Sequence, residues 1–393
     1  MRAALISLAG QPREVSADVP LTLAGKTLAR RQLDFALAAG CEGVIVLGEG
    51  GSGEAIALRH AAEAGGARFQ AIRDGHGLLG AVGADHELLV LAPGLLPEAP
   101  EAVEALTKGR RVLVFPAGPA VAAGFERIDL NRAWAGALVV GGAQVERLSA
   151  LPADIEPASA LVRIAMQATV RERPLSEKLL ADGSWTMFGE RADPAASDRT
   201  WLDRHARTAS PFALTQRLGR LGLRAGARRM LAAPHAPGGI AIAALGAVAG
   251  SILSTVYGLP SLGFALIALS ALVTQAGGEL AYLRTAPFGR SDRWASLRAV
   301  LPWLLDGAIL ACAVLTVEGT WLHRLFPPLV MLGSLHAARP EPRPDWAAVL
   351  GDRGVLALAL AVSAGFGLVE PAIMLIALVL IALALAQTVA RRG

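Results

Sequence analysis

The chain contains few of the residues that form covalent cross-links or bind metal ions tightly. Only two of its 393 residues are cysteines, Cys41 and Cys312, and they lie in opposite halves of the sequence, so we expect no disulfide between them. The seven histidines show no spacing typical of a metal site. The sequence also has no Walker loop and no G-x-S-x-G motif. These absences argue against a zinc site, P-loop nucleotide binding and α/β-hydrolase chemistry, and we predict no metal site.

A strong charge of either sign is missing as well. The 37 basic and 33 acidic side chains give a formal net charge of +4, which is small for this length and does not favour a nucleic-acid partner. Much of the basic excess is arginine beside apolar segments, where it would meet anionic lipid headgroups. We therefore expect membrane lipids, and no nucleic acid, as partners.

Long apolar stretches dominate the last third of the sequence. Hydrophobic residues make up 53% of the chain, and they concentrate after residue 237. Six stretches follow, at 238–258, 259–277, 299–317, 321–338, 354–369 and 372–390. Several approach the ~20 residues that an α-helix needs to cross a bilayer. Residues 236–393 are therefore predicted to form an all-α membrane domain with six transmembrane helices.

The arginines predict how these helices are oriented. They are frequent in the links between the second and third and between the fourth and fifth stretches, and after the last one, whereas Arg324 is the main basic residue near the opposite links. By the positive-inside rule, both ends of this domain face the cytoplasm. Residues 1–10 look like a buried strand and not like a signal peptide, so we also place the N-terminal half in the cytoplasm. The expected location is a bacterial-type inner membrane.

Residues 1–173 have the pattern of an α/β domain. Residues 2–9 are a continuous apolar run typical of a buried strand, and further strands are predicted at 43–47, 68–72, 87–91, 111–115 and 134–140. Segments with the apolar spacing of helices lie between most of these strands, as at 27–39, and a further helix is predicted at 159–170. Alternating strands and helices predict a mostly parallel sheet with helices on both faces. Ligands of such sheets bind beyond the carboxyl ends of the strands.

Two segments connect the two halves. Residues 174–210 are mixed and polar and are predicted to be a linker. Residues 211–235 carry arginines at three- and four-residue intervals and leucines on another part of the helical circumference. This pattern predicts an amphipathic juxtamembrane helix in the headgroup layer. A positive-inside anchor is the simpler interpretation of its arginines, and binding of a substrate phosphate is the alternative.

Two glycine-bearing loops are candidates for phosphate binding. Residues 48–53 (GEGGSG) follow a strand, open a helix and precede Asp74 by about twenty residues, as in the dinucleotide fingerprint. Glu49 would repel a pyrophosphate, so an ordinary strand-to-helix turn is the favoured interpretation of this loop. The other loop, residues 8–13 (LAGQPR), follows the first strand.

The second loop and the sequence after it resemble the start of sugar-nucleotide and alcohol-phosphate nucleotidyltransferases. In that family a glycine-rich loop ending in arginine wraps the nucleotide triphosphate, a lysine pairs with phosphate, and an aspartate holds magnesium. Gly10 and Arg13 match the loop, but Leu21 stands at the lysine position and residues 92–94 (APG) at the aspartate. Without that carboxylate, Mg²⁺ has no obvious protein ligand.

The favoured interpretation of residues 1–173 is therefore an inactive nucleotidyltransferase-like fold. The alternative is that another acid replaces the missing magnesium ligand. The acids nearest in sequence are Asp85 and Asp129.

Residues 272–297 resemble the active-site stretch of the CDP-alcohol phosphatidyltransferases, D-x2-D-G-x2-A-R followed by a spacer and G-x3-D-x3-D. The surrounding sequence is closest to inositol-phosphate members, in which such a membrane domain follows a cytidylyltransferase. In that family the four aspartates bind divalent cations, and one deprotonates the attacking alcohol. The motif glycines fall on Gly278 and Gly289. The aspartates fall on Thr274, Gly277, Arg293 and Leu297, so every carboxylate is missing.

The residues near this motif supply the candidate site. Glu279 and Asp292 are the only acids close to it and are the candidate catalytic residues, although ion pairs with the arginines are a more common arrangement than a metal site. The candidate phosphate- or nucleotide-binding residues of the whole chain are Gly10, Arg13, Gly278, Gly289, Arg290 and Arg293. Asp306 is a separate intramembrane acid and a functional candidate for that reason.

Together the two resemblances favour a catalytically degenerate membrane protein. It would bind a CDP-alcohol, a polyol phosphate or a phospholipid headgroup, or regulate an active relative. The alternative is an active phosphotransferase that uses Mg²⁺ and a cytidine nucleotide. A transporter has little support beyond Asp306 and the multiple spans, and a homodimer is compatible with the sequence.

Overall fold

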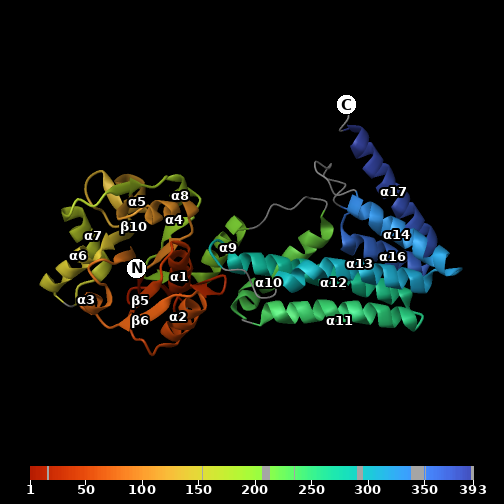
Figure 1. Cartoon of the computed structure of the whole chain (residues 1–393), viewed down its shortest axis with the longest axis horizontal. Coiled ribbons are helices and arrows are strands. Elements are labelled where there is room, and N and C mark those ends of the chain that lie inside the picture. Colours follow the sequence, from red (N-terminus) through yellow and green to blue (C-terminus); the bar gives the residue numbers. More distant parts are fainter. Residues whose placement is uncertain are drawn as a thin grey trace. The chain divides into compact units, whose positions relative to one another are not determined.

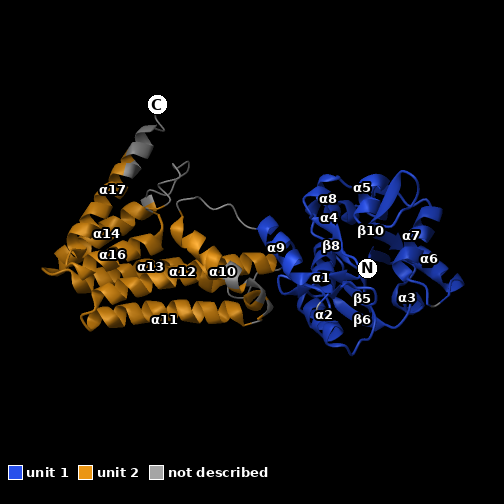
Figure 2. Cartoon of the chain, turned by 180° about the vertical axis from the view of Figure 1, so that it is seen from behind, with its two compact units in different colours: residues 1–205, 286–289 blue, residues 206–285, 290–393 orange. Residues whose placement is uncertain are grey.

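The computed structural model describes residues 1–15, 17–152, 154–205, 213–233, 235–289, 295–337, 349 and 351–390. The chain forms two compact units (Figures 1 and 2). Unit 1 contains residues 1–205 and the short segment 286–289, and unit 2 contains residues 206–285 and 290–393.

Unit 1 is built on a seven-stranded sheet in the order β11-β9-β10-β7-β1-β5-β6. The strands are β1 (Arg2–Ser7), β5 (Gly43–Leu47), β6 (Arg68–Ile72), β7 (Glu87–Leu91), β9 (Arg111–Pro116), β10 (Arg132–Gly141) and β11 (Glu172–Pro174). All neighbouring pairs are parallel except those made by β10, which runs antiparallel to β7 and β9. The predicted mostly parallel sheet is therefore confirmed.

Helices cover both faces of this sheet. They are α1 (Leu28–Ala38), α2 (Gly53–Ala64), α3 (Gly77–Ala81), α4 (Pro100–Thr107), α5 (Ala117–Ala122), α6 (Gly142–Glu146) and α7 (Pro157–Gln167). Alternate residues of one strand belong to different cores: Val44 and Val46 pack with residues of α1 and α2, whereas Ile45 packs in the larger cluster on the other face. Burial on both faces explains why β5 is a continuous apolar run in the sequence.

The segment that was predicted to be a linker is folded over most of its length. Its described part contains α8 (Lys178–Ala181), β12 (Trp185–Met187), β13 (Arg191–Ala192) and α9 (Pro194–His205). β12 pairs with β8 (Leu95–Pro97), and β13 pairs with β2 (Arg13–Glu14). Two tryptophans, Trp185 and Trp201, are fully buried and anchor this segment in unit 1. Few but large apolar residues therefore fix it, despite its polar composition.

A buried charge cluster attaches α9 to the rest of unit 1. Glu98 Oε1 accepts hydrogen bonds from Arg31 Nη1 (2.9 Å) and Trp201 Nε1 (2.7 Å), and its Oε2 accepts one from Arg204. The Arg31 guanidinium also lies 4.3 Å from the centre of the Trp201 ring. Glu98, Arg31 and Trp201 are almost completely buried, so the loss of one partner would leave a buried charged or polar group without compensation.

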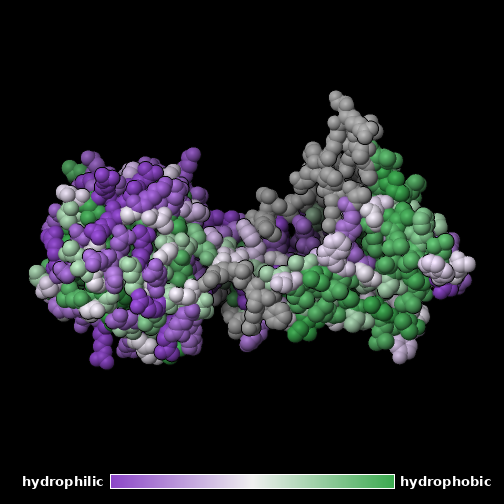
Figure 3. Space-filling model, viewed as in Figure 1, coloured by the Kyte–Doolittle hydropathy of each residue, from purple (hydrophilic) through white to green (hydrophobic). Residues whose placement is uncertain are grey.

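Unit 2 consists of helices. They are α10 (Leu214–Ala232), α11 (Ala236–Val256), α12 (Pro260–Thr285), α13 (Ala295–Thr316), α14 (Trp321–Ala337), α16 (Arg353–Gly365) and α17 (Val369–Ala390). All six apolar stretches of the sequence are thus helical. Three of these helices, α11, α12 and α13, are long and apolar enough to cross a membrane. This agrees with the prediction of a membrane protein. Large areas of the surface that they and their neighbours present are hydrophobic (Figure 3).

Small residues let the helices of unit 2 approach closely. A Cβ atom on Gly277 of α12 would lie 2.7 Å from Ile240 Cγ2 of α11. The hydroxyl of Ser270 donates a hydrogen bond of 2.8 Å to the Ala244 carbonyl oxygen, again between α12 and α11. Close backbone approach and polar contacts between helices are usual where helices associate within lipid.

The predicted amphipathic helix corresponds to α10. It packs on α12 at Gly219, where a Cβ atom would lie 3.3 Å from the Ala276 nitrogen. Its leucines at 214, 218 and 221 are exposed, in a row with helical spacing. The helix therefore has one face against the bundle and an apolar row facing outward.

Candidate functional site

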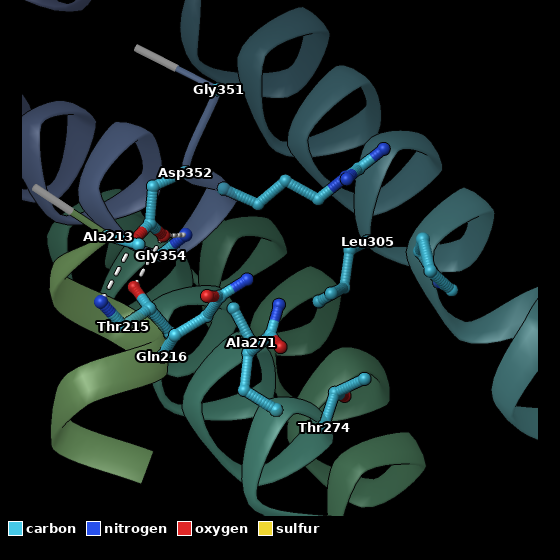
Figure 4. Close-up of a pocket in the computed structure, with 12 residues that line it drawn as sticks. Ala213, Thr215, Gln216, Ala271, Thr274, Leu305, Gly351, Asp352 and Gly354 are labelled. Atoms are coloured by element: carbon cyan, nitrogen blue, oxygen red, sulfur yellow. Dashed lines mark hydrogen bonds between the residues drawn. The ribbon is translucent and has the colours of Figure 1, made fainter. Parts of the chain in front are cut away.

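A pocket of about 280 Å³ lies in unit 2, between four helices (Figure 4). It is formed by the start of α10, the middle of α12, the first half of α13 and the start of α16. Its lining is half polar, with Thr215, Gln216, Thr274, Gln275, Asp352 and Arg353 as the polar members. This volume is just below the ~300–1,000 Å³ of small-molecule sites, so the pocket suits a small chemical group.

Asp352 fixes the geometry of the pocket at the start of α16. Its carboxylate caps that helix by accepting hydrogen bonds from the backbone nitrogens of Gly354 (3.0 Å) and Val355 (3.4 Å). The same carboxylate accepts hydrogen bonds from the backbone nitrogen (2.8 Å) and hydroxyl of Thr215 on α10 (Figure 4). Gly354 permits this approach, because a Cβ atom there would overlap the Thr215 side chain. One carboxylate thus joins two helix starts.

Arg353 forms a second polar contact beside the pocket. Its Nε and Nη2 donate hydrogen bonds of 2.6 and 2.7 Å to the two carboxylate oxygens of Asp306 on α13. His336 Nε2 of α14 lies 3.0 Å from the same carboxylate, and its ring stacks on Trp303. Asp306 is therefore a buried acid that is paired with a bidentate arginine, the geometry in which such pairs are strongest.

Three other polar side chains of the pocket have unused hydrogen-bonding capacity. The Thr274 hydroxyl oxygen is buried, and it has no hydrogen-bond partner in the structure. Gln216 and Gln275 also line the pocket, and within the described part of the chain their amides make no side-chain hydrogen bond. A buried hydroxyl without a partner loses about 1–3 kcal/mol of solvation, so an occupant that bonds to it would be stabilised.

Two of the expected aspartate positions, Thr274 and Gly277, lie in different surroundings on α12. Thr274 lines the pocket, but Gly277 faces Ile240, so a carboxylate at position 277 would collide with α11. The candidate acid Glu279 forms an ion pair with Arg220 of α10 at 3.0 Å. Within the described residues, no group of three or more His, Cys, Asp and Glu side chains could hold a metal ion.

Most of the remaining predicted residues of this stretch cannot be placed. Arg290, Asp292 and Arg293 lie outside the described residues. Gly278 has open space around its Cα atom on α12, and Gly289 belongs to the segment that groups with unit 1.

In unit 1, the loop after β1 is occupied by contacts of its own. Gln11 donates hydrogen bonds from its side-chain nitrogen to the Ser7 carbonyl (2.8 Å) and Gln32 (3.1 Å), and its side-chain oxygen accepts one from the Gly94 nitrogen (3.3 Å). The loops after β1 and β7 are thereby joined directly. This is the place in an open α/β sheet where a ligand would normally bind.

The residues predicted to bind a nucleotide here have other roles. Gly10 has a positive φ of 75° and lies against Pro93, where a Cβ atom would make ordinary contact at 3.5 Å. Arg13 is largely exposed and pairs with Asp18 at 2.7 Å. Asp129 pairs with Arg132, which lowers the pKa of Asp129 to about 2. The loop 48–53 forms a strand-to-helix turn in which Ser52 caps α2.

Comparison with known proteins gives no family for this chain. No protein-family model and no curated protein matches it.

The pocket residues Thr215, Gln216, Asp352 and Arg353 are not part of the motifs that the sequence suggested. An aspartate directly before a glycine-containing apolar run is a helix-start signal, so the cap at Asp352 was readable from the sequence, but its contact with α10 was not.

Proposed function

We propose that this chain is a non-catalytic membrane protein that binds the polar headgroup of a lipid in the pocket of unit 2. The observation that carries the proposal is the pocket itself. It contains the first position of the CDP-alcohol phosphatidyltransferase-like stretch, but Thr274 presents a hydroxyl there in place of the carboxylate of that motif. Hydroxyl and amide groups can bind a polar headgroup, whereas the described residues bring together no group of carboxylates to hold the divalent cation that phosphoryl transfer needs.

Features of unit 1 support the same proposal. The nucleotidyltransferase-like loop retains Gly10 and Arg13, but Gln11 joins it to the loop after β7, and Arg13 is paired with Asp18. A nucleotide would have to displace these contacts. We therefore assign unit 1 no catalytic role and regard the whole chain as a relative, in layout, of fused cytidylyltransferase–phosphotransferase proteins.

We further propose that the segments that contain α14, α16 and α17 also cross the bilayer, with the helix α16 itself covering only part of the thickness. This gives six spans with both termini in the cytoplasm of an inner membrane. The arginine distribution supports this orientation. We expect a reporter enzyme fused after Arg392 to give the signal of a cytoplasmic location. An exported reporter signal would contradict the six-span topology.

The proposal is tested with the full-length protein in detergent. Given labelled CTP, inositol phosphate and Mg²⁺, it should produce no CDP-alcohol and no phosphodiester product. Native mass spectrometry should instead detect a lipid that the protein retains. Thr274→Val should reduce the retention of this lipid, because the change removes the hydroxyl and keeps the side-chain shape. Turnover that is abolished by Glu279→Gln would establish the alternative, an active phosphotransferase.

A further inference from the structure

We infer that the pocket of unit 2 lies below the membrane surface and selects a lipid with an uncharged, hydroxyl-bearing headgroup, of which diacylglycerol is the simplest. This inference rests on the proposed function and names its ligand class. It follows from the depth of the pocket, from its charges and from its free hydrogen-bonding groups.

The depth follows from the length of α16. A Cβ atom on Gly365, the last residue of α16, would lie 3.7 Å from Ser261 Oγ, so the end of α16 is level with the start of α12. The neighbouring Tyr257 and Phe366 are both 76% exposed, as aromatic residues are at a membrane interface. This end of the bundle therefore marks one boundary of the hydrocarbon layer.

From that boundary α16 does not reach the other side. It has 13 residues and is about 20 Å long, whereas the hydrocarbon layer is about 30 Å thick. Its first residues, which line the pocket, thus lie about 10 Å inside the opposite boundary. Position 274 on α12 gives the same depth, because it follows Ser261 by 13 residues, or about 20 Å of helix.

At this depth the charge of the pocket decides which headgroup can enter. Asp352 carries a negative charge, and Arg353 is neutralised by its pair with Asp306. The described carboxylates and guanidinium at the pocket, those of Asp352, Asp306 and Arg353, therefore sum to a charge of −1. Charges interact strongly in a medium of low dielectric constant, so a phosphate group would be repelled.

An uncharged headgroup meets no such repulsion and can use the free groups. Thr274 has a buried hydroxyl without a partner, and the amides of Gln216 and Gln275 can both donate and accept. The Nη1 atom of Arg353 is not used in its pair with Asp306. These groups match the free hydroxyl and ester carbonyls of a diacylglycerol, which lie deep in the interface because no charge holds them at the surface.

The test uses full-length protein in nanodiscs of phosphatidylcholine that contain equal small amounts of diacylglycerol and phosphatidic acid with the same acyl chains. Native mass spectrometry measures which lipid is retained. We expect diacylglycerol to be retained on the order of tenfold more than phosphatidic acid. Thr274→Val and Gln216→Leu should each reduce its retention about fivefold, the effect of one lost hydrogen bond. Thr316→Val, the same change at a position outside the pocket, should have no effect.

The outcomes separate the inference from the function on which it rests. Preferred retention of phosphatidic acid that Thr274→Val reduces would overturn the inference and keep the proposed headgroup site. Retention of both lipids that neither pocket variant changes would overturn both. Soluble glycerol and inorganic phosphate, added as competitors in millimolar amounts, should not displace the lipid, and displacement by either would show that the ligand is a soluble molecule.

Discussion

Replacing Glu98 by alanine tests whether α9 is an integral part of unit 1. In the wild type, Glu98 accepts hydrogen bonds from Arg31, Arg204 and Trp201, and the last two of these belong to α9. Glu98→Ala removes the only acid that contacts both arginines in the described cluster. Arg31, whose side chain is 4% exposed, would then be left as a buried charge with fewer compensating contacts.

The expected effect is large because the pair is buried. Removing one partner of a buried ion pair typically destabilises a protein by about 3–5 kcal/mol. Since every 1.4 kcal/mol corresponds to a factor of ten, the equilibrium constant for opening of α9 should rise roughly a hundred- to a thousandfold. Exposed pairs contribute far less, so the pair of Glu104 with Lys108 provides a matched control.

Hydrogen exchange followed by mass spectrometry measures this opening in the full-length protein. Amides of residues 194–205 should exchange much faster in Glu98→Ala than in the wild type, whereas Glu104→Ala should leave them unchanged. Glu98→Gln, which keeps the shape and one acceptor oxygen, should have an intermediate effect. If the α9 amides of Glu98→Ala exchange at the wild-type rate, α9 is not held by this cluster, and the segment behaves as the linker that its composition suggests.

Three further predictions concern other parts of the chain. Burial raises the pKa of the Cys41 thiol to about 12, so iodoacetamide at pH 8 should label Cys41 only after denaturation, as peptide mapping would show. Gly277→Val should lower the free energy of unfolding by about 1–3 kcal/mol through its collision with Ile240, whereas Gly278→Ala, in open space within the same helix, should not lower it. Burial lowers the pKa of His205, so the neutral ring is favoured in the folded state, and protection of α9 should be constant above about pH 6.5 and fall as the pH decreases below it. Substituting phenylalanine for His205 should remove this pH dependence, and an unchanged pH profile would contradict the assignment.

The sequence alone determined the local structure and the chemistry that is missing. The strands β5 and β7 agree with their predicted ranges, because burial on both faces leaves an apolar run that can be recognised without knowledge of its neighbours. The edge strand β6 also agrees with its predicted range, although it is mostly exposed. The six apolar stretches are helical for a similar reason, since nearly every position of such a helix must be apolar. The loss of carboxylates at Thr274 and Gly277 is also a fact of the sequence.

Only the tertiary structure decided which residues meet. The antiparallel direction of β10 depends on the path of the chain between strands, and an apolar run carries no direction. The attachment of α9 depends on Trp201 and Glu98, which are 103 residues apart. The pocket depends on a hydrogen bond between Thr215 and Asp352, which are 137 residues apart. Contacts over such separations leave no periodic pattern, so they appear only when the packed helices bring the side chains together.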